Sequence, residues 1–129
     1  MDKRILIIED DRELADLMVD RLISEGFETS HVMDGLMGVS EAHKFKPHLI
    51  ILDLMLPGGG GVSVLDKLKM STHTRHIPII VLTGSDNDEL KKKVLDRGIS
   101  SYMQKPYDGK KLVEEIWKIL HLDEPFKEA

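Results

Sequence analysis

Three short runs of continuous apolar residues constrain the fold of this chain more than any other feature of its sequence. They span residues 5–8 (ILII), 49–52 (LIIL) and 77–82 (IPIIVL), and each is rich in β-branched side chains. Runs of this length without alternating polar residues are typical of strands buried on both faces, as in a parallel sheet. Two weaker strand patterns lie at Glu28–Val32 and Ser101–Gln104. The sequence therefore predicts five strands.

Helical patterns separate these strands. Four segments carry apolar residues at spacings of three and four, as in helices that bury one face. Their apolar positions are Leu14, Leu17, Met18 and Leu22; Leu36, Val39 and Ala42; Val62, Leu65 and Leu68; and Leu112, Ile116, Ile119 and Leu120. Ser85 and Asp88 resemble a capping box that begins a further helix, which we expect to end at Arg97 and Gly98. Asp108 fits the N-cap of the last helix.

Strict alternation of strands and helices predicts an α/β fold of the form (βα)5. Such a chain forms a doubly wound parallel sheet with helices on both faces, joined by right-handed crossovers. The 129 residues are 41% hydrophobic and 32% charged, which suits one domain with one core system. We expect the domain to span residues 1–122 and residues 123–129 to form a polar tail or the start of a linker.

Charge and composition exclude several functions. The formal net charge of −5 argues against direct binding of nucleic acid, which needs clustered basic residues. The absence of cysteine excludes disulfides and thiolate metal sites. The first apolar run is far shorter than the roughly 20 residues that span a bilayer, and the acids that follow it do not fit a signal peptide. We expect a cytoplasmic protein that makes no membrane contact.

Polar residues follow the predicted strands at the point where each strand ends. Residues 9–11 (EDD) follow the first strand, Asp53 the third, Thr83 the fourth and Lys105 the fifth. In a doubly wound sheet these ends share one edge, where ligands of such folds bind. Carboxylates, a hydroxyl and an ammonium group should therefore converge there.

Converging carboxylates repel one another unless a cation compensates them. A cluster of oxygen ligands without histidine or cysteine favours Mg²⁺, with Mn²⁺ as an alternative, over zinc. Asp11 has a simpler interpretation, since acids favour the first turn of a helix. The sequence thus predicts a magnesium site at this edge of the sheet.

The chain resembles the receiver domains of two-component response regulators, a CheY-like family. The resemblance runs from Lys3 to about Leu120 and rests on residues 5–11, 52–58, 81–84 and 102–107. No one of these motifs is diagnostic, but their order and spacing together are highly specific. The resemblance implies a flavodoxin-like sheet with strand order 2-1-3-4-5.

The resemblance also implies a role for each matching residue. Asp53 matches the phosphoacceptor; Glu9, Asp10, Asp53 and the backbone carbonyl of Met55 match the metal ligands; Thr83 and Tyr102 match the switch pair; Lys105 matches the site lysine, with a cis peptide at Lys105-Pro106. The donor would be a sensor histidine kinase or a phosphotransfer protein. The domain would assist its own phosphorylation and dephosphorylation without being an enzyme.

In the family, the phosphoryl group changes the surface formed by the fourth helix, the fifth strand and the fifth helix. The resemblance therefore implies a downstream effector, which is unknown, that binds this surface. A homodimer that forms on phosphorylation is also compatible with it. Trp117 is a candidate contact there, although packing at the margin of the last helix explains it equally.

Several features depart from the family pattern or stand outside it. Gly59 and Gly60 replace a pair that commonly contains an acid, so we expect a mobile loop after Asp53. Gly84 should leave the phosphoryl site open to water. His73 and His76 lack an evident third ligand and are interpreted as surface histidines.

Three other functions remain open at this stage. A flavodoxin-type FMN carrier has a similar fold, but the acids after the first strand would repel phosphate. A phosphatase of the haloacid dehalogenase class uses an aspartyl nucleophile with a second Asp two residues later, where this chain has Met55. A receiver-like interaction module that works without phosphate would not need the complete set of site residues.

Overall fold

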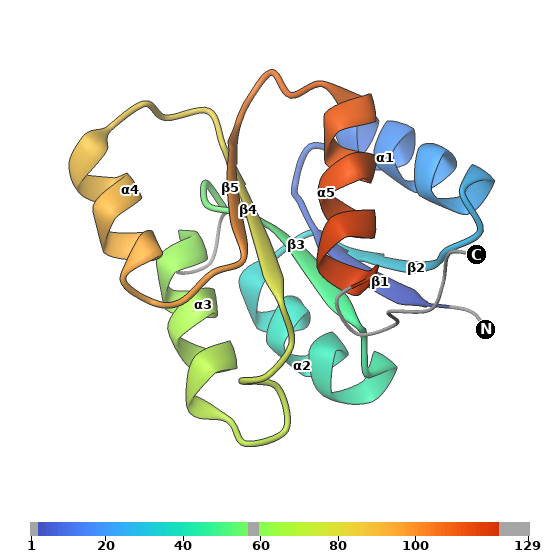
Figure 1. Cartoon of the computed structure of the whole chain (residues 1–129). Coiled ribbons are helices and arrows are strands. Elements are labelled where there is room, and N and C mark those ends of the chain that lie inside the picture. The colour runs from blue at the N-terminus through green and yellow to red at the C-terminus, as the bar shows by residue number, and fades with distance from the viewer. Residues whose placement is uncertain (1–2, 57–59, 122–129) are drawn as a thin grey trace.

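The computed structural model describes residues 3–56 and 60–121, and strands and helices alternate throughout (Figure 1). The elements are β1 (Arg4–Ile8), α1 (Arg12–Ser24), β2 (Glu28–Val32), α2 (Gly35–Phe45), β3 (Leu49–Asp53), α3 (Gly60–Met70), β4 (Ile79–Thr83), α4 (Asp88–Leu95), β5 (Ser101–Gln104) and α5 (Gly109–His121). Residues 122–129 lie outside the described residues, so the expected tail or linker there stays a prediction.

All the described strands join one parallel sheet in the order β2-β1-β3-β4-β5. The predicted fold class and strand order are therefore confirmed. Helices α1 and α5 cover one face of the sheet, and α2, α3 and α4 cover the other (Figure 1). The chain passes from β1 to β2 on one side and to β3 on the other side of β1, so the strand order has a switch point between β1 and β3. Ligands of open α/β sheets bind at the carboxyl ends of the strands beside such a point.

Two hydrophobic layers explain why the three central strands carry apolar side chains on both faces, apart from Arg4 at the start of β1 and Asp53 and Thr83 at the ends of β3 and β4. Leu6 and Ile8 of β1 pack with α2, α3 and α4, while Ile5 and Ile7 pack with α1 and α5. Strands β3 and β4 alternate in the same way, and all ten of their residues are buried. Because both faces are covered, polar alternation would place charges in the core.

The apolar spacing predicted the helices but not every buried position. Leu17 and Leu36 are 68% and 69% exposed, so neither contributes to the core. Trp117 is half-buried and packs against Phe27, with ring centroids 5.3 Å apart. Within residues 3–56 and 60–121, no helix combines the length and apolar character needed to cross a membrane.

The predicted capping box of α4 is wrong. Asn87 is the N-cap, and its side chain accepts a hydrogen bond from the Leu90 N–H at 3.0 Å. The Ser85 hydroxyl instead accepts the Asn87 N–H at 3.1 Å and shapes the preceding turn. The helix also ends at Leu95, earlier than expected, and Gly98 follows with a φ of 77°. The capping role of Asp108 is confirmed, because its carboxylate accepts the Lys110 N–H at 2.9 Å.

The start of α3 packs directly against the strand that carries Asp53. The Gly61 N–H donates to the Leu54 carbonyl at 2.8 Å. A Cβ atom on Gly61 would overlap the Leu54 Cα and lie 2.8 Å from the Leu54 carbonyl oxygen. Only glycine permits this approach. The mobile-loop prediction falls mostly on residues 57–59, which lie outside the described residues.

Candidate functional site

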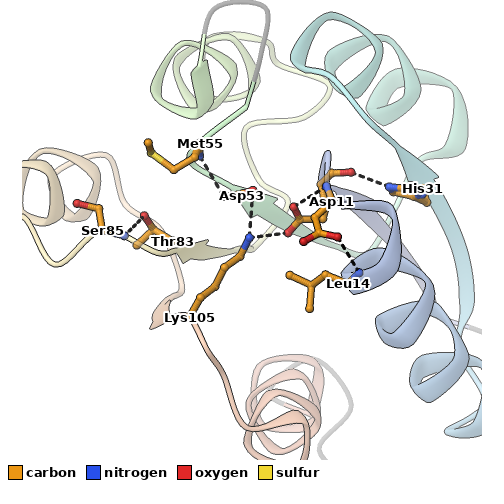
Figure 2. Close-up of polar contacts among 9 residues, drawn as sticks. Asp11, Leu14, His31, Asp53, Met55, Thr83, Ser85 and Lys105 are labelled. Carbon is orange, nitrogen blue, oxygen red and sulfur yellow. Dashed lines mark hydrogen bonds and ion pairs between the residues drawn. The ribbon is translucent and has the colours of Figure 1, made fainter.

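The carboxyl ends of β1, β3, β4 and β5 bring the predicted polar residues to one edge of the sheet. Asp53 and Thr83 are the last residues of β3 and β4, while Glu9 and Lys105 directly follow β1 and β5. Figure 2 shows the Lys105 side chain reaching from the end of β5 toward Asp53. Residues that are far apart in the sequence therefore meet because parallel strands end together.

Three carboxylates form the floor of this site. Glu9, Asp10 and Asp53 each offer a ligand oxygen within 4.8 Å of the others. Glu9 and Asp53 are only 1% and 3% exposed, whereas Asp10 faces solvent. Oxygen ligands in this number suit a hard divalent cation such as Mg²⁺. Asp11 serves another purpose, since its carboxylate accepts the Leu14 N–H at 3.2 Å and caps α1.

Lys105 is the positive partner of the two buried acids. Its Nζ lies 2.9 Å from Glu9 Oε1 and 3.2 Å from Asp53 Oδ2. Buried charges are tolerated only when they are paired. One ammonium group between two carboxylates leaves an excess of negative charge at this edge.

The excess negative charge appears in the proton affinities. Burial, together with the adjacent Asp53, raises the pKa of Glu9 to about 7, although the Asp11 N–H and Lys105 act in the opposite direction. Burial lowers the pKa of Lys105, but the hydrogen bonds and charges of Glu9 and Asp53 outweigh burial and raise it above its usual value. A divalent cation at the acids would compete with the Glu9 proton.

Backbone groups hold both buried carboxylates in place. Asp53 Oδ1 accepts the Met55 N–H at 3.0 Å, and Oδ2 is left to Lys105 (Figure 2). Glu9 Oε2 accepts the Asp11 N–H at 3.1 Å.

His31 on β2 bonds the Glu9 carbonyl through Nε2 at 2.8 Å, a contact that the sequence did not suggest. It arises because β2 lies beside β1, and no motif marks His31.

The two candidate switch residues have partners outside the acidic cluster. Thr83 is fully buried, and its Oγ1 accepts the Ser85 N–H at 3.1 Å (Figure 2). The Lys105 N–H donates to the Thr83 carbonyl at 2.8 Å, and the Lys105-Pro106 peptide is cis. Tyr102 is half-buried against the layer under α2, α3 and α4, and the Lys91 ammonium lies 5.3 Å from its ring centroid.

The fold and the acidic edge with its lysine define the CheY-like class of α/β proteins. The sequence profile of the response regulator receiver domain matches residues 5–117. The chain therefore belongs to the response regulator receiver domain family.

Individual relatives agree with this assignment. The chain is 33% identical over 125 residues to the phosphate regulon transcriptional regulatory protein PhoB of Escherichia coli, covering 97% of this chain and 55% of PhoB. It is 34% identical over 116 residues to the DNA-binding response regulator MtrA of Mycolicibacterium paratuberculosis, covering 90% of this chain and 50% of MtrA. The chain thus spans about half the length of these relatives.

Solved structures give the same answer. A CheY-like response regulator receiver domain protein from Methanospirillum hungatei superposes with a TM-score of 0.87 at 28% identity, over the whole of both chains. The receiver domain of the sensor histidine kinase PA1611 from Pseudomonas aeruginosa has a TM-score of 0.83 at 25% identity, covering 92% of this chain and 97% of that one. That structure has a magnesium ion coordinated in its active site cleft.

Proposed function

We propose that this receiver domain accepts a phosphoryl group on Asp53 in a reaction that depends on Mg²⁺, with Mn²⁺ as a substitute. The proposal rests on one observation: the two oxygens of the Asp53 carboxylate have different hydrogen-bond partners. Met55 fixes one oxygen and Lys105 the other, beside two further acids at the mouth of a buried strand. A nucleophile held in this way meets an incoming phosphoryl group without reorganisation.

The donor is a phosphohistidine on a sensor kinase or a phosphotransfer protein. An Asp53 oxygen forms a bond to phosphorus, the phosphorus–nitrogen bond breaks, and the departing imidazole nitrogen takes up a proton. Charge in such reactions lies mainly on the phosphoryl oxygens, so positioning and compensation dominate catalysis. Glu9, Asp10, Asp53 and the Met55 carbonyl would hold Mg²⁺, which would supply part of that compensation, and the Lys105 ammonium supplies the rest.

Thr83 and Tyr102 carry the signal outward in this proposal. The Thr83 hydroxyl donates to a phosphoryl oxygen, and Tyr102 moves into the space that Thr83 leaves. The surface of α4, β5 and α5 then changes its population of conformations. The half-buried Tyr102 ring lies at this surface, beside Lys91 of α4.

The partners follow from the same proposal. A downstream effector binds the α4-β5-α5 surface, or a second copy pairs through it after phosphorylation. Direct binding of nucleic acid would belong to a different domain, as the longer PhoB and MtrA relatives suggest by their names. We propose that residues 1–122 act as a phosphoacceptor unit in the cytoplasm and are not an independent enzyme.

Incubation with acetyl phosphate and Mg²⁺, followed by intact mass measurement, tests the proposal. We expect one phosphoryl group per chain in the unaltered protein and none in Asp53→Ala. Asp34→Asn is a matched control, because Asp34 also follows a strand at this edge but only caps α2, a role that Asn fills equally well. Labelling at another residue would overturn the proposal, and absence of labelling in the unaltered protein would favour a phosphate-independent module. Steady turnover of a phosphomonoester would favour a phosphatase.

A further inference from the structure

A histidine-lined pocket lies at the opposite edge of the sheet, where β1 and β3 begin. Its volume is about 320 Å³, and its lining includes His43, His48, His73 and His76 with Arg4. The pocket thus holds four of the six histidines of the chain. They come from the end of α2, the residue before β3 and the segment between α3 and β4. No aspartate or glutamate is among the described residues that line the pocket.

His43 presents a defined nitrogen lone pair to its surroundings. Its Nδ1 lies 2.9 Å from the Val39 carbonyl, which can only accept, so Nδ1 carries the proton. In the neutral ring, Nε2 is then the nitrogen that keeps a lone pair, and it lies 3.2 Å from the Ser71 hydroxyl. A ring N–H bonded to a backbone carbonyl, with the other nitrogen turned outward, is the usual arrangement of a histidine that binds a metal.

His73 stands beside this lone pair. The two imidazole centroids are 5.9 Å apart, with the rings tilted by 54°. The backbone N–H of His73 donates to the same Ser71 hydroxyl at 3.2 Å. In the described part of the chain, the His73 and His76 side chains make no hydrogen bond, and His43, His73 and His76 are all exposed. Both rings can therefore turn at small energetic cost.

We propose that His43 and His73 form a two-imidazole site for a borderline transition metal ion, with Zn²⁺ as the test case. A metal about 2.0–2.1 Å from one nitrogen of each ring would hold the ring centroids roughly 5–6 Å apart, close to the observed separation. Imidazole nitrogen suits Zn²⁺, Cu²⁺ and Ni²⁺, whereas Mg²⁺ requires oxygen. The site is thus chemically distinct from the acidic edge. The bound metal would take the place of the Ser71 hydroxyl beside His43 Nε2, and water would complete its coordination. His76 lines the same pocket.

An anion is the competing ligand, since the basic residues Arg4 and Lys46 line the pocket. The Arg4 guanidinium, however, already donates to the Phe45 carbonyl at 3.0 Å and to the Lys46 carbonyl at 2.7 and 3.0 Å. The backbone N–H of Arg4 donates to His48 Nδ1 at 2.9 Å, so this nitrogen is already used. His48 therefore lines the pocket without offering Nδ1 to a metal, unlike Nε2 of His43. This difference makes His48 a discriminating control.

Titration calorimetry with Zn²⁺ tests the site in the full chain, with saturating Mg²⁺ present to occupy the acidic edge. We expect His43→Gln and His73→Gln each to weaken Zn²⁺ binding at least tenfold, and His48→Gln to leave it unchanged. Zn²⁺ should also raise the melting temperature of the unaltered protein but not of the double variant, because a ligand that binds only the folded state stabilises it. All the substituted side chains are polar, and circular dichroism verifies the fold.

Equal Zn²⁺ affinity in the unaltered protein and the His43→Gln, His73→Gln double variant would overturn the proposal. So would the loss of binding in His48→Gln alone. Titration with inorganic phosphate tests the alternative that the pocket binds anions. If phosphate, and not Zn²⁺, shifts the imidazole resonances of the pocket in NMR spectra, the pocket binds anions and the metal assignment is wrong.

Discussion

The two edges of the sheet hold their ionisable side chains in opposite ways. At the carboxyl edge, Glu9 and Asp53 are almost fully buried and share one lysine. At the amino edge, His43 and His73 are exposed, and Arg4 donates to backbone carbonyls. Buried charges depend on one another, so a change at the carboxyl edge should alter chemistry and stability together. A change at the amino edge should leave the phosphorylation of Asp53 unaffected.

Removal of the shared ammonium group should have the largest effect. Lys105→Met leaves Glu9 and Asp53 without their cation and removes one charge from the transition state. We expect labelling by acetyl phosphate to slow by roughly 100-fold or more, the size seen when one preorganised donor is lost. Lys111→Met, an exposed lysine on α5, is the control. An unchanged labelling rate in Lys105→Met would remove the charge argument from the carboxyl edge.

Gly61→Ala tests whether the carboxyl edge depends on close backbone packing as well as on charge. The added Cβ meets Leu54 backbone atoms, which cannot yield as a flexible side chain would. We expect a loss of about 3 kcal/mol in unfolding free energy, measured by denaturant titration. Gly84→Ala is matched to it, since a Cβ there meets nothing within 4 Å. Equal losses in the two variants would show that packing against Leu54 is not tight.

Glu9→Gln should change how stability responds to pH. The folded state raises the pKa of Glu9 from 4.5 to about 7, so it binds the proton more tightly than the unfolded chain. Stability of the metal-free protein should therefore fall as pH rises from about 4.5 to about 7, by an amount on the order of 3 kcal/mol. The glutamine variant should lose most of this dependence. Denaturation curves in the presence of a chelator measure it, and equal slopes in both proteins would contradict the burial of Glu9 charge.

The opening beside Thr83 gives a smaller, kinetic prediction. Gly84 is exposed, and a Cβ atom added there would meet no atom within 4 Å. Gly84→Val should obstruct the approach of water to the phosphoryl group on Asp53 and slow its loss severalfold. The decay of labelled protein after removal of acetyl phosphate measures this rate. A decay rate equal to that of the unaltered protein would refute the steric argument.

The smallest effect is expected at the amino edge. Arg4→Met removes the guanidinium bonds to the Phe45 and Lys46 carbonyls, which lie partly in solvent. We expect a loss of about 1 kcal/mol in unfolding free energy, with no change in labelling rate. A slower labelling rate would show that the two edges are coupled through β1, and would break the contrast between them.

Fold and site differ in how far the sequence predicts them. The strands followed from their apolar runs, because residues buried on both faces tolerate no polar alternation. Glu9, Asp53, Thr83 and Lys105 could be predicted to meet because parallel strands end at a common edge. Their roles in phosphoryl transfer come from the family resemblance and stay a proposal.

The failures arose where tertiary contacts decide. Leu17 and Leu36 have helical spacing, yet the sheet lies on the other side of their helices. Ser85 matched a capping pattern, but the chain turns later and Asn87 is the cap. His73 and His76 are exposed, as predicted, but their pocket also includes His43 and His48, which are near them only in space. No local spacing could have supplied those neighbours.

The hydrogen bond from the Ser85 N–H to Thr83 Oγ1 has a consequence for signal fidelity. In the proposed switch, a turn of the Thr83 side chain toward a phosphoryl group would move Oγ1 away from the Ser85 N–H. Its net worth of roughly 0.5–1.5 kcal/mol corresponds to a two- to tenfold bias toward the resting state. Under the proposed function, this bond would reduce output from unphosphorylated molecules. A weaker bond would raise that background output and make the change on phosphorylation easier.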